Sequence, residues 1–429
     1  MTEKLLICVL LLPLVAALAI ICLWDLRRQK ELRIVTCGTL TVMAVLLWYL
    51  AITGRGTETL TLFSLTEDFA VTFAAELFGR YFAAVAVTAW AGVEVFLSVC
   101  LEPGKHEPRF FICTLLISCT VTGLSYAANF MTMFLFFEAT IFLFFPLIMH
   151  YQTEASAEAG RRYFLGAFLS GLVALMGACC FSMYVSDLGF VSGGALDATF
   201  AGGKNRIVIL ISAALMVAGF GMFSHVVSEC GWLPGVERDI PVTVQAQSAG
   251  VIANLGVFAA VRSVYYLVGA DYLFGSGAQV FLILFAVLMS GAGIFLMWRT
   301  GNREDIRLGR IEPEKRQKMT SDGETGIISD GEPGKETKKK RKMTSDRKAG
   351  MVSDGETVKK QESTSDGKTE KKSEAKQSGR MLYIVLNQSG YAFLLLAIFQ
   401  PVGLYLALGY AAVHMLMAIL IPLYTLMKD

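Results

Sequence analysis

The sequence predicts an all-α polytopic membrane protein, a bundle of about 11 transmembrane helices. Of its 429 residues 54% are hydrophobic, and the mean hydropathy of +0.54 is higher than soluble domains usually reach. Apolar runs of about 20 residues, the length of a helix that crosses a bilayer, recur from end to end of the chain. A soluble core does not need so many runs of this length, so the soluble class is excluded.

The apolar runs place the predicted helices along the chain. They cover approximately residues 4–24, 33–53, 75–100, 109–127, 129–150, 161–185, 205–226, 240–268, 276–298, 381–399 and 402–427. The first run is longer than the core of a signal peptide, and its basic cluster follows rather than precedes it, so we predict a retained helix. Basic and non-basic loops alternate. Because cytoplasmic loops carry the excess of Lys and Arg, we predict a multi-pass protein of the cell membrane with its N-terminus outside and its C-terminus cytoplasmic.

One segment does not share this composition. Between Arg299 and Arg380 there are 22 Lys and Arg and 16 Asp and Glu, and short units such as TSDGE, ISDGE, VSDGE and TSDGK recur. Such a segment cannot bury enough apolar area to offset the entropy cost of ordering. We predict a disordered cytoplasmic insertion at 301–380, between a membrane domain at 1–300 with helices 1–9 and a second membrane part at 381–429 with helices 10 and 11. Because acids are interleaved with bases, nucleic-acid binding is not expected.

Cysteine and histidine usage does not indicate a cofactor or a metal site. The chain has nine cysteines, most of them inside apolar runs, and none forms the C-x-x-C pattern typical of iron–sulfur or haem ligands. Its four histidines are scattered. No cofactor and no metal ion are therefore expected in this chain itself.

The stretch MTMFLFFEATIFLFFPLIMH carries a single acid, Glu138, near its centre. A charged side chain in mid-bilayer costs at least a few kcal/mol, so such residues face a bundle interior and serve an ion pathway or a charge pair. We predict Glu138 as a proton-relay residue; a neutral, hydrogen-bonded structural glutamate is the alternative. A second acid, Glu94, lies nearer a helix end and is expected to reach the membrane interface.

Four further polar residues are candidates for the same relay. The stretch GFGMFSHVVSECGWLP places His225 and Glu229 one helical turn apart, before a polar, Pro-containing link that predicts a broken helix. An ordinary helix end, with both side chains in water, explains this stretch equally well. Asn254 is a lone polar residue on an apolar helix face, with Arg262 near the end of that helix. His414 lies within GYAAVHMLMAIL, with an interfacial histidine as the alternative.

Several of these stretches together resemble the antiporter-like subunits of respiratory complex I (NADH:quinone oxidoreductase), Mrp-type cation/proton antiporters and membrane-bound hydrogenases. They are FSLTEDFAVTF, NFMTMFLFFEATIFLFFPLIMHY, GFGMFSHVVSECGWLP, AGVIANLGVFAAVR and, beyond the insertion, LYIVLNQSGYAFLLLAIF. The resemblance implies a membrane-arm subunit with a partial inverted repeat, a truncated second half, and membrane and peripheral partner subunits. It implies protons or sodium as the ions moved and electron transfer in partner subunits. This chain would then be at most a non-catalytic membrane subunit of an NADH:quinone oxidoreductase-type or hydrogenase-type complex.

The resemblance carries over to single residues only in part. Glu138 matches the family's membrane glutamate, whereas the lysine of the broken helix falls at Phe223 and the lysine of the following helix at Asn254. A carboxyl group without a cation beside it is expected to conduct poorly. The sequence therefore leaves two hypotheses: a proton- or cation-translocating subunit with Glu138 at its centre, or a non-conducting structural subunit that has lost the relay lysines. An unrelated secondary transporter is a third possibility.

Overall fold

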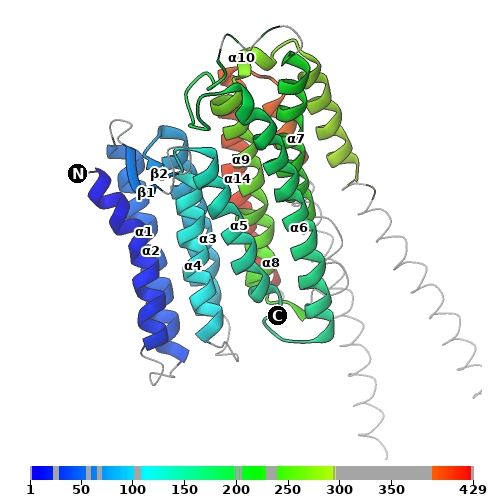
Figure 1. Ribbon diagram of the computed structural model, residues 1–429. Coiled ribbons are helices and arrows are strands. Elements are labelled where there is room, and N and C mark those ends of the chain that lie inside the picture. Colours follow the sequence, from blue (N-terminus) through cyan, green and yellow to red (C-terminus); the bar gives the residue numbers. More distant parts are fainter. Residues whose placement is uncertain are drawn as a thin grey trace, which may run out of the picture. The chain divides into compact units, whose positions relative to one another are not determined.

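The computed structural model is a bundle of helices with one small β-hairpin (Figure 1). It describes residues 2–22, 29–54, 59–64, 70–100, 108–197, 199, 202, 205–228, 239–292, 295 and 389–426. The chain divides into two units, Met1–Leu296 with Met381–Asp429 and Met297–Arg380. Every described residue belongs to the first unit. The predicted insertion at 301–380 lies outside the described residues and stays a prediction.

The helices follow the predicted apolar runs closely. They are α1 (Thr2–Cys22), α2 (Gln29–Thr53), α3 (Leu77–Cys100), α4 (Pro108–Ser125), α5 (Phe130–Ile148), α6 (Glu154–Phe181), α7 (Asn205–Ser228), α8 (Val242–Gln247), α9 (Ala253–Arg262), α10 (Ala270–Leu273), α13 (Ser389–Leu396), α14 (Pro401–Leu426) and the helix Gly277–Ala292. Short 3₁₀ and π segments are η1 (Ser182–Tyr184), η3 (Ser248–Ile252) and η4 (Ser263–Val268). Each predicted span overlaps one of these helices, and seven of the described helices are long and apolar enough to cross a membrane. The predicted class, a polytopic helical membrane protein, is confirmed.

The hairpin replaces what the sequence predicts as a plain loop. Its strands are β1 (Thr59–Ser64) and β2 (Ala70–Ala74), which pair antiparallel. Both strands contain Thr and Phe, and β2 also contains Val; these residues favour extended backbone. The turn between α4 and α5 covers the other edge of β2: Ala74 N–H donates to Tyr126 O at 2.7 Å, and Ala128 N–H donates to Thr72 O at 2.8 Å. The hairpin is therefore held by the bundle and satisfies backbone groups at one end of it.

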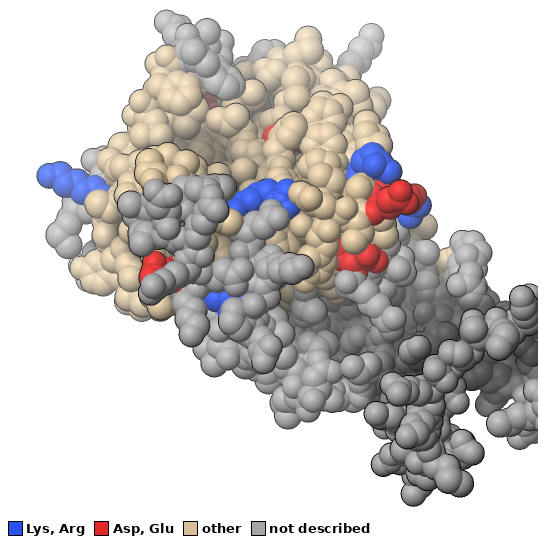
Figure 2. Space-filling model, turned by 90° about the horizontal axis from the view of Figure 1, so that it is seen from below, with Lys and Arg blue, Asp and Glu red and all other residues tan. Residues whose placement is uncertain are grey.

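One helix lies at the core of the bundle. The segments α8, η3, α9 and η4 follow one another without a gap over Val242–Val268, and we call this stretch the central helix. Its most apolar stretch is 94% buried, against 33% for α1. The helices α3, α7, α13 and α14 all pack against it. Seen from the end at which α8 begins, charged side chains of the described residues form only small groups on a largely uncharged surface (Figure 2).

Glycines let α6 and α7 approach until their backbones touch. A methyl group at Gly219 of α7 would lie 2.6 Å from Ser170 O and 2.8 Å from the Ala174 Cα atom. A methyl group at Gly177 of α6 would lie 2.7 Å from Ser212 O. Membrane helices have no hydrophobic driving force between them, and small residues allow the close packing that holds them together.

We predict that Gly219→Val destabilises the protein because the new side chain meets backbone, which cannot move away. The expected loss is about 1–3 kcal/mol or more, seen as a lower unfolding temperature of the detergent-solubilised chain. The matched control is Gly38→Val in α2, where a methyl group would meet nothing within 4 Å. Equal losses at the two positions would show that helix propensity, and not close packing, determines the effect.

Candidate functional site

Three of the buried polar side chains on the central helix contact side chains of other elements. They are Gln247, Asn254 and Arg262, each at most 2% exposed. Their spacing of seven and eight residues places them about 10 and 12 Å apart along the helix axis. Buried polar groups need hydrogen-bond partners, and each of the three finds one on another element. We call these residues and their side-chain partners, Glu94, His414 and Glu76, the buried polar column.

At the end where α8 begins, the column joins α8 to α3. Gln247 Nε2 donates to Glu94 Oε1 at 2.7 Å. Glu94 is only 5% exposed, so the expectation that it reaches the membrane interface is wrong. The reason is tertiary: α8 and α14 pack against α3 and cover a side chain that would be accessible on an isolated helix. The sequence analysis did not single out Gln247, although it is a polar residue inside an apolar run.

In the middle of the column, Asn254 meets His414 of α14. Asn254 Nδ2 donates to Gly250 O at 2.5 Å and lies 2.8 Å from His414 Nδ1. Because an amide nitrogen only donates, His414 Nδ1 accepts and the neutral ring carries its proton on Nε2. His414 is 1% exposed, so it lies inside the bundle rather than at an interface. Asn254 lies two residues beyond Ile252, where the π-helical segment η3 ends. Such π segments are frequent at functional sites.

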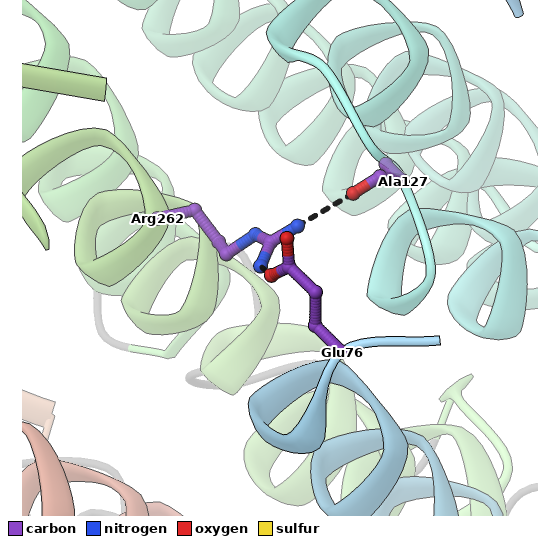
Figure 3. A network of polar contacts seen from close by, with 3 residues as sticks. All are labelled: Glu76, Ala127 and Arg262. Carbon is purple, nitrogen blue, oxygen red and sulfur yellow. Dashed lines mark hydrogen bonds and ion pairs between the residues drawn. The ribbon is translucent and has the colours of Figure 1, made fainter. Parts of the chain in front are cut away.

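At the other end, Arg262 joins three elements (Figure 3). Its Nη1 forms an ion pair with the carboxylate of Glu76, just before α3, and its Nη2 donates to Ala127 O at 2.6 Å in the turn before α5. The guanidinium carbon lies 4.3 Å from the ring centroid of Phe190 and 4.8 Å from that of Tyr266, within cation–π range. The charge of Arg262 is therefore neutralised and enclosed.

Glu138 lies apart from the column, between α5 and α6. Asn129 caps α5 by accepting from Thr132 N–H at 2.7 Å, and Glu138 follows two turns later. The side chain occupies space left by Gly171 of α6, where a methyl group would collide with Oε1. Both carboxyl oxygens are buried, and neither has a hydrogen-bond partner among the described residues. Such an oxygen is costly to bury unless a proton, a water molecule or an ion satisfies it.

An aromatic contact lies between the helix of Glu138 and the central helix. The Phe137 ring centroid is 4.5 Å from that of Phe223 and 5.2 Å from that of Phe220, both on α7. Phe223 also faces the central helix, where a methyl group at Gly256 would lie 3.1 Å from its Cδ1. None of the described contacts joins Glu138 to Asn254 or His414, and the ring contacts of Phe137 link α5 to α7.

Two predicted relay residues and the predicted helix break fall outside this description. Glu229 and the link 229–238 are not among the described residues, and for His225 only the backbone of α7 is described. Their roles, like those of Glu138, Asn254 and His414, stay predictions. In the described part of the chain, no three His, Cys, Asp or Glu side chains come together in a way that could hold a metal ion.

The fold and the buried polar column define a polytopic helical membrane protein with polar groups enclosed by the bundle. Residues 127–298, from the turn before α5 to beyond the helix Gly277–Ala292, match the model of the family described as NADH:quinone oxidoreductase/Mrp antiporter, transmembrane. The predicted resemblance to this family is therefore confirmed over this part of the chain. No curated protein matches the chain.

Solved structures share the fold at low sequence identity. A chain of the Mrp complex from Dietzia sp. DQ12-45-1b is 13% identical with a TM-score of 0.64, over 97% of this chain and 36% of that one. A chain of the membrane-bound sulfane sulfur reductase, an archaeal respiratory membrane complex, is 17% identical with a TM-score of 0.51, over 66% of this chain and 57% of that one. The present chain therefore spans about a third of the matched Mrp chain and less than three fifths of the matched reductase chain.

We predict that Arg262→Met destabilises the protein by about 3–5 kcal/mol, because Glu76 is left without its cation in the bundle. The double variant R262M/E76Q is expected to recover part of this loss, since no unpaired charge then remains. Unfolding temperatures of the four proteins in a double-mutant cycle measure the coupling.

The matched control is the exposed pair of Arg162 and Glu158 on α6. Arg162→Gln is expected to change stability by less than about 1 kcal/mol, because water solvates both groups. If R262M and R162Q gave the same small effect, the Arg262 network would not contribute to the stability of the bundle.

Proposed function

We propose that the chain is a proton- or cation-translocating membrane-arm subunit of a complex I-like, hydrogenase-like or Mrp-like assembly. The observation that carries this proposal is the buried polar column on a helix with two π segments. Polar side chains enclosed in a membrane bundle are costly, and their usual use is to line an ion path. The family match over residues 127–298 supports the same conclusion.

Glu138 is the proposed central protonatable group. Its buried oxygens lack a partner among the described residues, so each is available to a proton or a water molecule. On the central helix, His414 can pass a proton because a neutral imidazole accepts at one nitrogen and donates at the other. Asn254 holds the His414 ring through Nδ1. His225 and Glu229 are proposed as further polar positions near the interrupted span.

The proposed route between these groups passes Phe223. Its ring contacts Phe137, next to Glu138 in the chain, and faces Gly256, two residues beyond Asn254. No hydrogen-bonded link spans this distance among the described side chains. Proton exchange between Glu138 and His414 therefore requires water to enter beside the Phe223 ring, which acts in the proposal as a gate.

The surroundings of the chain belong to the same proposal. Both matched chains come from multi-subunit complexes. One belongs to an Mrp complex and the other to a respiratory membrane complex. We therefore propose membrane and peripheral partner subunits, protons or sodium as the ions, and the cell membrane as the location. The predicted orientation places the N-terminus outside and the 301–380 insertion and the C-terminus in the cytoplasm.

A second candidate is a non-conducting structural subunit of the same kind of assembly. The aromatic contact of Phe137, Phe220 and Phe223 favours it, because Phe223 stands where the family resemblance implies a lysine. Such a subunit would couple neighbouring subunits mechanically without passing ions itself. The family match gives no support to the third possibility, an unrelated secondary transporter.

We predict that Glu138→Gln lowers proton or sodium flux roughly 100-fold or more, as expected when a proton-transferring group is removed. The measurement is ion uptake by vesicles from cells that make the full assembly. The control is Glu158→Gln on the exposed face of α6, which is expected to leave flux unchanged. Flux unaltered by E138Q would remove Glu138 from the route and favour the structural subunit.

A further inference from the structure

Glu94 and Gln247 form a contact that the proposed route does not use. They are 153 residues apart in the sequence and come together where α3 packs against α8. Both side chains are more than nine-tenths buried, and Gln247 Nε2 donates to Glu94 Oε1 at 2.7 Å. On the central helix this pair lies 15 residues, or about 22 Å, from Arg262. It is therefore the polar contact of the column at the end opposite the Arg262 network.

Among the described residues, no cation forms an ion pair with Glu94. Thr114 of α4 is fully buried, and its hydroxyl faces the carboxyl group without making a hydrogen bond of normal geometry. Arg33 of α2 acts on Glu94 electrostatically but does not form an ion pair with it. The nearest titratable side chain of α14 in the column, His414, is bonded to Asn254. Among the described residues, Gln247 is thus the principal hydrogen-bond partner of Glu94.

A glutamine partner differs from a lysine partner in one chemical respect. The amide carries both a donor, NH₂, and an acceptor, C=O. The NH₂ group donates to a carboxylate, as observed, and after rotation of the amide the C=O group accepts from a carboxylic acid. A lysine would stabilise only the carboxylate. Gln247 Oε1 is buried and has no partner among the described residues, so an acceptor for that proton is already present.

We propose that Glu94 and Gln247 form a reversible proton-binding site between α3 and α8. A proton adds to the Glu94 carboxylate to give the carboxylic acid, and the Gln247 amide turns so that its oxygen accepts the new O–H. Release of the proton reverses both changes. Each protonation state keeps one hydrogen bond between the two side chains, so neither state leaves the buried Glu94 carboxyl group without a partner. This inference deepens the proposed function, on which it rests, by adding a proton-binding site at one end of the column.

The experiment is pH-difference infrared spectroscopy of the full chain in lipid membranes, recording the C=O stretch of protonated carboxyl groups. We expect the wild-type protein to gain such a band on acidification. Glu94→Gln should lose that component, whereas Glu138→Gln, the control, should keep it. Gln247→Leu keeps the carboxyl group but removes the amide, so the remaining Glu94 band should move to higher frequency.

The proposal is overturned if the difference spectra of E94Q and Q247L both equal that of the wild type. If E94Q or Q247L fails to insert into the membrane, its unfolding profile will differ from that of the wild type. The spectrum of the other variant then tests the proposal. Because the infrared band reports proton binding and not transport, it separates the two proposals. A wild-type protein with normal flux but without the Glu94 band would contradict only the proton-binding site. A wild-type protein with the Glu94 band but without any flux would contradict only the translocating function.

Discussion

The burial of the central helix inside the bundle is the constraint on which the rest of the structure depends. Polar groups on a helix that is covered on all sides can be satisfied only by the protein, since an unmet hydrogen bond costs about 1–3 kcal/mol. Gln247, Asn254 and Arg262 therefore each require a partner from a different part of the chain. These partners set how α3 and α14 pack against the central helix.

The same requirement explains the organisation of one end of the bundle. Where helices end, backbone groups lose their partners inside the helix and must find others. Here β2, the turn before α5 and the segment after η1 pair through their backbones: Phe190 N–H donates to Ala128 O at 2.9 Å, and Val191 N–H donates to Tyr266 O at 2.9 Å. Arg262 adds its charge to this layer through Ala127 O and the Glu76 carboxylate. Backbone pairing and a buried ion pair thus close this end together.

The predicted relay residues lie in two places in this chain. Glu138 lies against α6, and neither of its carboxyl oxygens has a partner among the described residues. Asn254 of the central helix meets His414 of α14. Phe223, which contacts Phe137, stands at the position where the family resemblance implies a cation. In the proposed function, proton transfer between the two places therefore depends on water.

The sequence by itself determined the membrane class, the helices and the presence of Glu138, because apolar runs of bilayer length and a lone acid within one of them are local features. It also indicated Asn254 and His414 as separate polar residues. Only the tertiary structure decided that these two meet, that Glu94 is buried against Gln247, that Arg262 pairs with Glu76, and that a predicted loop is a paired hairpin. The physical reason is that burial and hydrogen-bond partners depend on helix packing between residues as much as 186 positions apart, which periodicity along the chain does not encode.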